Sequence, residues 1–292
     1  MCIVAIAWQL FDELPLVLLS NRDEFLARTT EQLHQWPDQP IYAGRDSQSG
    51  GTWLGIYQQH HQQSQQQNQQ QNQQQNQQST EDNQSPSYQQ NGRWAAVLNF
   101  RDGVQARADE RSRGELVTSF LTSTLSPMAF ARQIKLRDYA GFNLIIGDSQ
   151  QAVIVNNRGH APTALHAGLH VFSNGQPDEG WFKTEKLRGR LRQEVLPLIA
   201  EDSSLAYWQA AALNVMSDST SASEEALPKT GVPKAIEQAL SSVYIDAVAL
   251  SNTDTPMPSY GTRTQSILTL RGEDKSEVTA QLISRETDNV KC

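Results

Sequence analysis

The sequence contains little cysteine, and this scarcity excludes most structural uses of the residue. Only Cys2 and Cys292 occur in 292 residues. A disulfide framework needs more cysteines in a shorter chain. A structural zinc site needs a second Cys/His pair at ligand spacing, and none is present. The sequence therefore predicts neither disulfides nor a metal site.

Clustered positive charge and long apolar runs are also missing. The formal net charge is -8 and basic residues are scattered, so we expect no nucleic-acid partner. No apolar run approaches the roughly 20 residues of a membrane-spanning helix. The apolar segment 3–8 lacks a preceding basic region and is soon followed by Asp12 and Glu13, unlike a signal peptide. We therefore expect a cytoplasmic protein without a membrane span.

Apolar residues make up only 38% of the chain, and one tract accounts for much of the deficit. Residues 58–91 are mostly Gln, Asn and Ser, and this composition cannot bury a core. We therefore predict a disordered insertion over 58–91 at a hairpin tip, within a single domain that covers residues 1–292.

The remaining segments alternate between strand-like and helix-like patterns. Strands are expected at 3–8, 16–20, 92–99, 142–146, 152–156, 169–172, 243–250, 265–270 and 278–283. Helices are expected at 115–125, 128–134, 182–199 and 205–216, with a loop over 217–234. Hairpin-joined strands with helices between them predict an α+β fold with antiparallel sheets. We also expect Trp53 and Phe142 to be core residues, because apolar neighbours surround both.

Cys2 is the most reactive candidate because of where it stands. Cysteine is small enough for Met1 to be removed, and Cys2 would then carry a thiol and a free α-amine. Such an amine has a pKa of about 7.7–8, so a single residue supplies both nucleophile and base. The alternative, favoured by residues 1–2 alone, is an ordinary buried cysteine. We also expect the Cys2 ammonium and Arg22 to lower the pKa of the thiol.

Polar residues that could support this chemistry lie at strand ends. Arg22 and Asp23 end the strand expected to pair with the Cys2 strand, and Arg263 lies near a strand start. Asn99 and Asn174 end two other strands, and an asparagine amide is a neutral donor for an oxyanion. A local salt-bridge cluster and ordinary turn asparagines are the alternatives. Their shared position allows one end of a sheet to gather all five.

Seven short motifs then occur in an order typical of one family. They are residues 1–3 (Met-Cys-Ile), 21–25 (Asn-Arg-Asp-Glu-Phe), 50–55 (Gly-Gly-Thr-Trp-Leu-Gly), 113–117 (Arg-Gly-Glu-Leu-Val), 141–144 (Gly-Phe-Asn-Leu), 169–174 and 260–264 (Tyr-Gly-Thr-Arg-Thr). The chain closely resembles the NRDE family, also called the transport and Golgi organization protein 2 family. That family is similar to the N-terminal nucleophile (Ntn) hydrolases, so the resemblance implies a four-layer αββα sandwich of two antiparallel sheets.

Within the Ntn superfamily, the closest pattern is that of cysteine-type choloylglycine hydrolases and penicillin V acylases, which cleave linear amides. The resemblance implies the following site residues: Cys2 as nucleophile, Arg22 and Asp23 as the early Arg and Asp, Asn99 and Asn174 as the two Asn, and Arg263 as the late Arg. Those enzymes separate the early Arg and Asp by two residues, whereas here they are adjacent. Strand alternation would place Glu24, rather than Asp23, on the Arg22 face, so Glu24 is an alternative acid.

Two functions follow from the resemblance. The first is hydrolysis of a linear amide, a small molecule of unknown identity, without a cofactor. The second is a non-catalytic carrier or chaperone for haem or an acyl-type ligand, since eukaryotic members are associated with Golgi and mitochondrial organisation, lipid metabolism and haem trafficking. Haem would need an axial ligand from His160, His166 and His170, or the Cys2 thiolate. The oligomeric state is left open.

The first prediction concerns the Gln-rich tract. Replacing residues 58–91 with a short Gly/Asn turn should leave the melting temperature nearly unchanged. Loop closure costs only about 0.6 kcal/mol for each doubling of loop length, and the tract contributes no core. Thermal unfolding of the shortened and full-length chains checks this. A large drop would mean that the tract packs on the domain.

Overall fold

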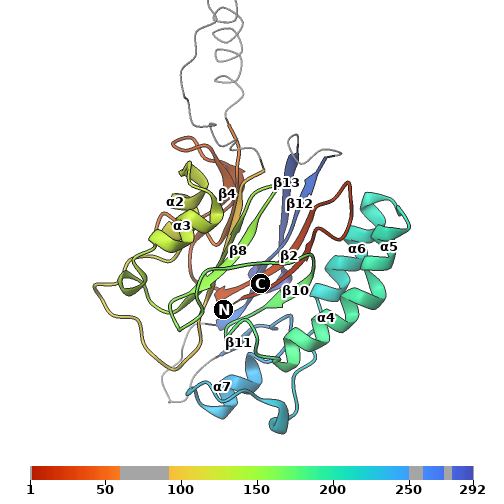
Figure 1. Ribbon diagram of the computed structural model, residues 1–292. Helices are drawn as coiled ribbons and strands as arrows, with labels where there is room; N and C mark the ends of the chain where they lie inside the picture. Colours follow the sequence, from red (N-terminus) through yellow and green to blue (C-terminus); the bar gives the residue numbers. More distant parts are fainter. Residues whose placement is uncertain (1, 60–91, 250–258, 273–277, 292) are drawn as a thin grey trace, which may run out of the picture.

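The computed structural model describes residues 2–59, 92–249, 259–272 and 278–291. Their strands form two antiparallel sheets that face each other, with helices on both outer sides (Figure 1). The predicted insertion at 58–91 lies outside the described residues, apart from Gln58 and Gln59. Its flanks are strands β5 (Leu54–Tyr57) and β6 (Trp94–Asn99), which pair with each other as the predicted hairpin requires.

The first sheet carries Cys2. Its strands are β1 (Cys2–Trp8), β2 (Leu16–Phe25), β10 (Gly168–Phe172), β11 (Val248–Ala249), β12 (Ser259–Arg271) and β13 (Thr279–Glu286). Their order is β10-β1-β2-β12-β11, and β13 also pairs with β12. In the pairing of β1 with β2, Cys2 lies opposite Arg22.

The second sheet is a meander in which every strand pairs with the next one along the chain. It consists of β3 (Thr30–Gln35), β4 (Ile41–Asp46), β5, β6, β7 (Phe142–Gly147), β8 (Ala152–Asn156) and β9 (Thr163–Ala164). Sequence analysis did not identify β3 and β4. The polar segment Thr30–Gln35 lacks the apolar alternation of a half-buried strand, because β3 lies at the sheet edge with no buried residue.

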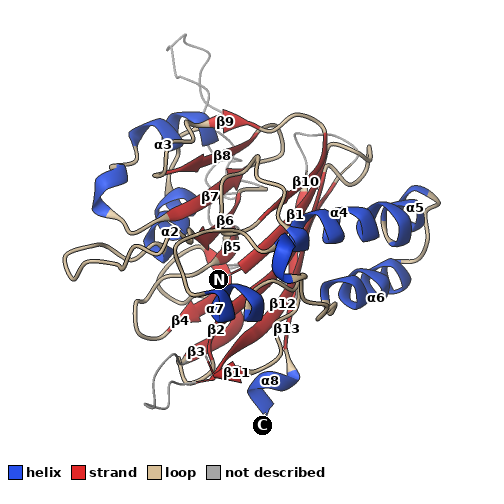
Figure 2. Ribbon diagram, turned by 90° about the horizontal axis from the view of Figure 1, so that it is seen from below, coloured by secondary structure: helices blue, strands red, loops and turns tan. Residues whose placement is uncertain are grey.

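The helices divide between the two outer faces. They are α2 (Gly114–Thr122), α3 (Pro127–Gln133), α4 (Phe182–Glu194), α5 (Leu196–Ala200), α6 (Leu205–Met216), α7 (Lys234–Ala239) and α8 (Asp288–Lys291), with 3-10 turns at Leu136–Asp138 and Glu224–Ala226. Helices α2 and α3 cover the second sheet, whereas α4, α5 and α6 cover the first (Figure 2). No helix among the described residues is long and apolar enough to cross a membrane.

Side-chain alternation along β1 builds two of the three core layers. Four of its residues pack between the sheets: Cys2, Val4, Ile6 and Trp8. The other three pack against α4 and α6: Ile3, Ala5 and Ala7. A third cluster, which includes Phe120 and Phe142, lies between the second sheet and α2. The four layers are therefore helix, sheet, sheet and helix, which confirms the αββα fold implied by the resemblance.

Two of the predicted elements are wrong in detail. The helix expected over 182–199 is interrupted at Val195, because Pro197 stands in the first turn of α5 and cannot donate a backbone hydrogen bond. The strand expected over 243–250 is reduced to β11 within the described residues. Val243 and Ile245 are apolar because they are buried in the core. The apolar run therefore reflects packing rather than strand pairing.

The two aromatic residues predicted to be core differ in the structure. Phe142 is fully buried in the cluster beneath α2, as predicted. Trp53 is only half-buried, and the Arg22 guanidinium lies 4.1 Å from the centre of its ring. Trp53 packs against the core between the sheets and also lines a surface cavity, so the prediction of a core residue holds only in part.

Two glycines bring α2 against the loop that precedes β5. A Cβ atom on Gly51 would lie 2.7 Å from the carbonyl carbon of Gly114, and one on Gly114 would lie 2.9 Å from the Thr52 nitrogen. This backbone contact fixes the chain near Trp53, two residues after Gly51, and Arg113, which directly precedes Gly114.

The second prediction tests this contact. Gly51→Ala should destabilise the protein by about 1–3 kcal/mol, because the methyl group must displace backbone atoms. Gly189→Ala in α4 is the matched control, since nothing lies within 4 Å of its added Cβ. The control should stabilise by roughly 0.5–1 kcal/mol through helix propensity. Urea denaturation measures both, and equal effects would contradict the packing argument.

Candidate functional site

A cavity of about 310 Å³ opens beside Cys2 where the two sheets meet. Residues of β1, β2, β4 and β6 contribute to its wall, together with the segment that leads into α2. Its charged lining residues are Arg22, Asp23, Glu24, Arg28, Asp46, Arg107, Glu110, Arg111 and Arg113. The cavity is therefore suited to a polar or charged ligand group placed next to a thiol.

Cys2 lies in the wall of this cavity with only 8% of its surface exposed. Burial raises the pKa of the thiol above its ordinary value of 9.0, because the thiolate loses its hydration. The N-terminal positive charge, a hydrogen bond from the Asp23 backbone and Arg22 all lower this pKa, but burial outweighs them. With Met1 in place the thiol pKa is therefore raised, whereas the predicted lowering concerns the chain without Met1 and stays a prediction.

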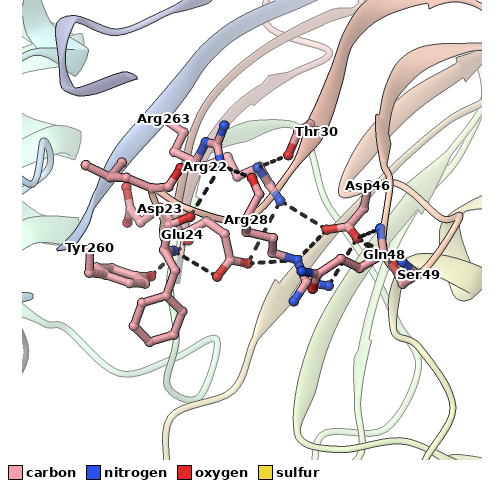
Figure 3. Close-up of polar contacts among 12 residues, drawn as sticks. Arg22, Asp23, Glu24, Arg28, Thr30, Asp46, Gln48, Ser49, Tyr260 and Arg263 are labelled. Carbon is pink, nitrogen blue, oxygen red and sulfur yellow. Dashed lines mark hydrogen bonds and ion pairs between the residues drawn. The ribbon is translucent and has the colours of Figure 1, made fainter. Parts of the chain in front are cut away.

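Arg22 is held on the cavity side of β2 by a network that includes β4. Its guanidinium lies 3.3 Å from Asp46 and donates to Thr30 at 3.1 Å. Arg28 binds the same carboxylate through two hydrogen bonds of 2.6 and 3.1 Å (Figure 3). Burial raises the pKa of Asp46. The hydrogen bonds from Arg28 and Ser49 outweigh burial and hold this pKa below its ordinary value. The network keeps Arg22 over the ring of Trp53.

The two candidate acids, Asp23 and Glu24, occupy different environments. The Glu24 carboxylate lies 3.9 Å from both Arg22 and Arg28, on the cavity side. The Asp23 carboxylate is fully buried and accepts a hydrogen bond from Thr262 at 2.7 Å. Its negative charge raises the pKa of Cys2. Asp23 therefore lies near the thiol, whereas Glu24 belongs to the arginine network.

Behind Asp23 lies a buried lysine that sequence analysis did not identify. Lys183, in the first turn of α4, is 2% exposed and donates to Asn174 at 3.2 Å. Burial and the positive charge of Arg101 together lower its pKa to about 8, although the negative charges of Asp23 and Cys2 oppose this shift. A lysine gives no signal of burial in the sequence, because its environment depends on tertiary packing.

The two predicted asparagines lie side by side but play different parts. Asn99, at the end of β6, lines the cavity. Asn174 is fully buried outside the cavity lining, and its side-chain amide donates to the Asn99 carbonyl oxygen at 2.9 Å. Ser173 donates to the Cys2 carbonyl oxygen at 3.2 Å. The segment after β10 therefore connects the Cys2 strand to Asn99 across the two sheets.

Asn174 is held in place from the second sheet. The Asn143 side chain donates to the carbonyl oxygens of Ser173 at 3.1 Å and Gly175 at 2.8 Å. Asn156 in turn donates to Asn143 at 3.1 Å. Asn143 belongs to one of the family motifs, so its buried amide gives that motif a structural role.

Arg263 lies apart from the Cys2 cavity. It is the unpaired residue of an irregularity in β12, where Thr262 faces Asp23 and Thr264 faces Arg22. Its guanidinium donates to the carbonyl oxygens of Phe25 and Leu26 at 3.3 Å, and also to that of Arg28. Arg263 therefore shapes the turn that carries Arg28, but it is not part of the cavity wall.

The candidate haem ligands also lie outside the cavity wall. His166 and His170 contact each other at 4.7 Å between ring centres, and His170 bonds the His166 carbonyl oxygen. Burial lowers the pKa of His170. Within the described part of the chain, no group of three or more His, Cys, Asp or Glu side chains could hold a metal ion.

The third prediction uses the low pKa of Lys183. In the folded protein Lys183 loses its proton near pH 8, whereas in the unfolded chain it keeps the proton to about 10.5. The unfolded state therefore binds more protons between these values, and stability rises with pH. Relative to Lys183→Met, the wild type should gain up to about 3 kcal/mol over this interval.

Urea denaturation at several pH values measures this difference. Lys234→Met is the control, because the Lys234 side chain is 63% exposed. Parallel stability curves for the wild type and Lys183→Met would contradict the buried position of Lys183.

Comparisons with known proteins place the chain in a family. A family model described as Transport and Golgi organisation 2 matches residues 1–85 and 87–284. The human "Transport and Golgi organization protein 2 homolog" is 29% identical over 182 residues, which are 58% of this chain and 53% of that protein. The mouse homolog is 29% identical over 180 residues, with the same coverage of both chains. The chain thus spans about half the length of the curated relatives it matches.

One solved structure with a similar backbone is a Caenorhabditis elegans N-acylethanolamine-hydrolyzing acid amidase ortholog. It is 10% identical, with a TM-score of 0.43, and the match covers 74% of this chain and 86% of that one. The family model, in contrast, spans nearly the whole chain, including Cys2 and residues 21–25. The chain belongs to the Transport and Golgi organisation 2 family.

Proposed function

We propose that the protein is an N-terminal cysteine hydrolase that cleaves a linear, non-peptide amide of a small molecule in the cytoplasm. The observation that carries the proposal is the position of Cys2 in the wall of a charged cavity, opposite Arg22 and next to buried Asp23. A nucleophile needs a base, an orienting group and a place for the substrate carbonyl. Each has a candidate within this cavity.

The base is the α-amine of Cys2, which is free once Met1 is removed. The amine takes the thiol proton as sulfur attacks the amide carbonyl, and the leaving amine then takes this proton as the C–N bond breaks. The resulting thioester is hydrolysed by water, which releases the acid and restores the thiol. A raised thiol pKa suits this order, because the proton leaves only when the amine and a carbonyl are both in place.

The oxyanion of the tetrahedral intermediate needs a donor near Cys2. The Asn99 side chain lines the same cavity and is the candidate donor. Asn174 acts as a positioning residue, since its side chain donates to the Asn99 carbonyl oxygen and does not line the cavity. Asp23 lies where it can orient the α-amine, because its charge acts on the thiol of the same residue.

The alternative is a non-catalytic carrier for haem or an acyl-type ligand. The Cys2 cavity offers haem few ligands: no histidine lines it, and burial disfavours the Cys2 thiolate. The described residues therefore do not fit haem well. An acyl-type ligand remains compatible with the cavity, and retained Met1 would favour this alternative.

The fourth prediction is that p-nitrophenyl acetate acylates Cys2. Intact-mass measurement should show a chain without Met1 that gains one acetyl group and loses it again on incubation. Cys2→Ala should abolish this adduct, and Cys292→Ala should leave it unchanged. Peptide mapping assigns the modified residue. A visible spectrum of the protein mixed with haem should show no new bound-haem band.

Three outcomes would count against the hydrolase. Retained Met1 would block the amine, an adduct confined to Cys292 would mean an unreactive Cys2, and a haem band lost in Cys2→Ala would support the carrier.

A further inference from the structure

We propose that Arg113 recognises an anionic group, a carboxylate or a phosphate, on the ligand that occupies the Cys2 cavity. The inference rests on the proposed function, because it assigns a chemical class to the ligand of the same cavity. The role of Arg113 follows from the distribution of charge in the cavity wall and does not depend on the reactivity of Cys2.

Five arginines line the cavity, and four of them already have carboxylate partners. Arg22 and Arg28 bind Asp46 at 3.3 and 2.6 Å. Arg107 pairs with Asp109 at 3.1 Å, and Arg111 pairs with Glu115. The charges of these four guanidiniums are already balanced by carboxylates, so they attract a further anion less strongly.

Arg113 differs from the other four. Its guanidinium donates to the Gly141 carbonyl oxygen at 3.2 Å, and it forms no ion pair with any described carboxylate. A guanidinium carries five N–H donors, so most of those of Arg113 remain available to a ligand. The donors form a planar fork that matches a carboxylate or a phosphate.

Burial destabilises the charged Arg113 guanidinium as long as no anion is bound beside it. Burial lowers the pKa of Arg113, and the negative charges of Glu24 and Cys2 only partly oppose that effect. A desolvated cation without a counter-ion is unfavourable. An anionic ligand group would supply the missing charge. Cys2 and Arg113 line the same cavity, so one ligand can contact both.

The backbone holds Arg113 in this position. Arg113 directly precedes α2, and the contact between Gly114 and Gly51 presses this end of the helix against the cavity wall. Ser112 and Gly114 line the cavity on either side of Arg113. The first backbone N–H groups of α2 add a partial positive charge to the same region, which favours an anion there.

A pair of thiol reagents that differ only in charge tests the proposal without substrate turnover. N-ethylmaleimide is neutral, whereas 3-maleimidopropionate carries a carboxylate at the end of the same ring substituent; 6-maleimidohexanoate extends the reach. The rate of Cys2 modification by each reagent is measured by peptide mapping at one alkaline pH. Arg113→Gln should lower the rate ratio of anionic to neutral reagent by about tenfold, the effect of one charge-assisted hydrogen bond.

Two variants control this measurement. Arg107→Gln removes a cavity arginine that is ion-paired, and the ratio should stay at the wild-type value. Arg113→Lys keeps the charge but loses the fork, and the ratio should fall less than in Arg113→Gln. An unchanged ratio in Arg113→Gln, or an equal fall in Arg107→Gln, overturns the proposal. Competition by acetate or by inorganic phosphate then identifies which anion binds.

Melting temperature separates this inference from the proposed hydrolase. If neither maleimide modifies Cys2, the hydrolase proposal fails, but the anion site is still decided. Phosphate or acetate should raise the melting temperature of the wild type and of Arg107→Gln, but not that of Arg113→Gln. Equal increases in all three proteins would overturn the role of Arg113.

Discussion

The hydrogen bond from the Asn174 side chain to the Asn99 carbonyl joins the two sheets at the end where Cys2 lies. It acts together with the ion pair of Arg22 with Asp46, which also joins the sheets, and both interactions are directional whereas the apolar contacts between the sheets are not. The same asparagine accepts from Lys183 of α4, so three layers meet at one buried amide. Because such an amide is expensive to leave unsatisfied, its bonds hold the relative positions of the sheets. The cavity beside Cys2 exists in the space that these bonds define.

This constraint divides the charged groups around Cys2 into two sets. On the cavity side, Arg22, Glu24 and Arg28 gather around Asp46, where solvent and ligand can reach them. Asp23, which also reaches the cavity wall, and Lys183 behind it are buried, and burial shifts both pKa values toward the neutral forms. Strand alternation produces the division, since neighbouring residues of β2 point to opposite faces. The adjacent Arg22 and Asp23 therefore occupy two different environments.

The parts of the site that could be predicted from the sequence are those set by local pattern. The two short apolar runs at 3–8 and 16–20, with turn signals between them, predict the hairpin, and this pairing alone brings Arg22 opposite Cys2. Arg28, Asp46 and Lys183 were missed because their roles depend on partners far along the chain. Burial of the Cys2 thiol was missed for a similar reason, since nearby charges are visible in a sequence whereas burial is a property of the folded core. Arg263 was placed at the right strand start, but an extra residue in β12 directs its side chain to a different turn.

A buried thiol with a raised pKa has a consequence for when the chemistry can occur. In the free protein Cys2 is mainly a protonated thiol, which reacts slowly with oxidants and stray electrophiles. An anion on Arg113 would add negative potential to the cavity and favour the protonated thiol still more. Activation must then come from a base in direct contact with the thiol rather than from the general field of the arginines. If the protein is the proposed hydrolase, the α-amine of the same residue meets this requirement, since it would take the proton at short range while sulfur attacks. Ligand capture by the arginine side of the cavity and proton removal at Cys2 would then be separate tasks, carried out by different groups.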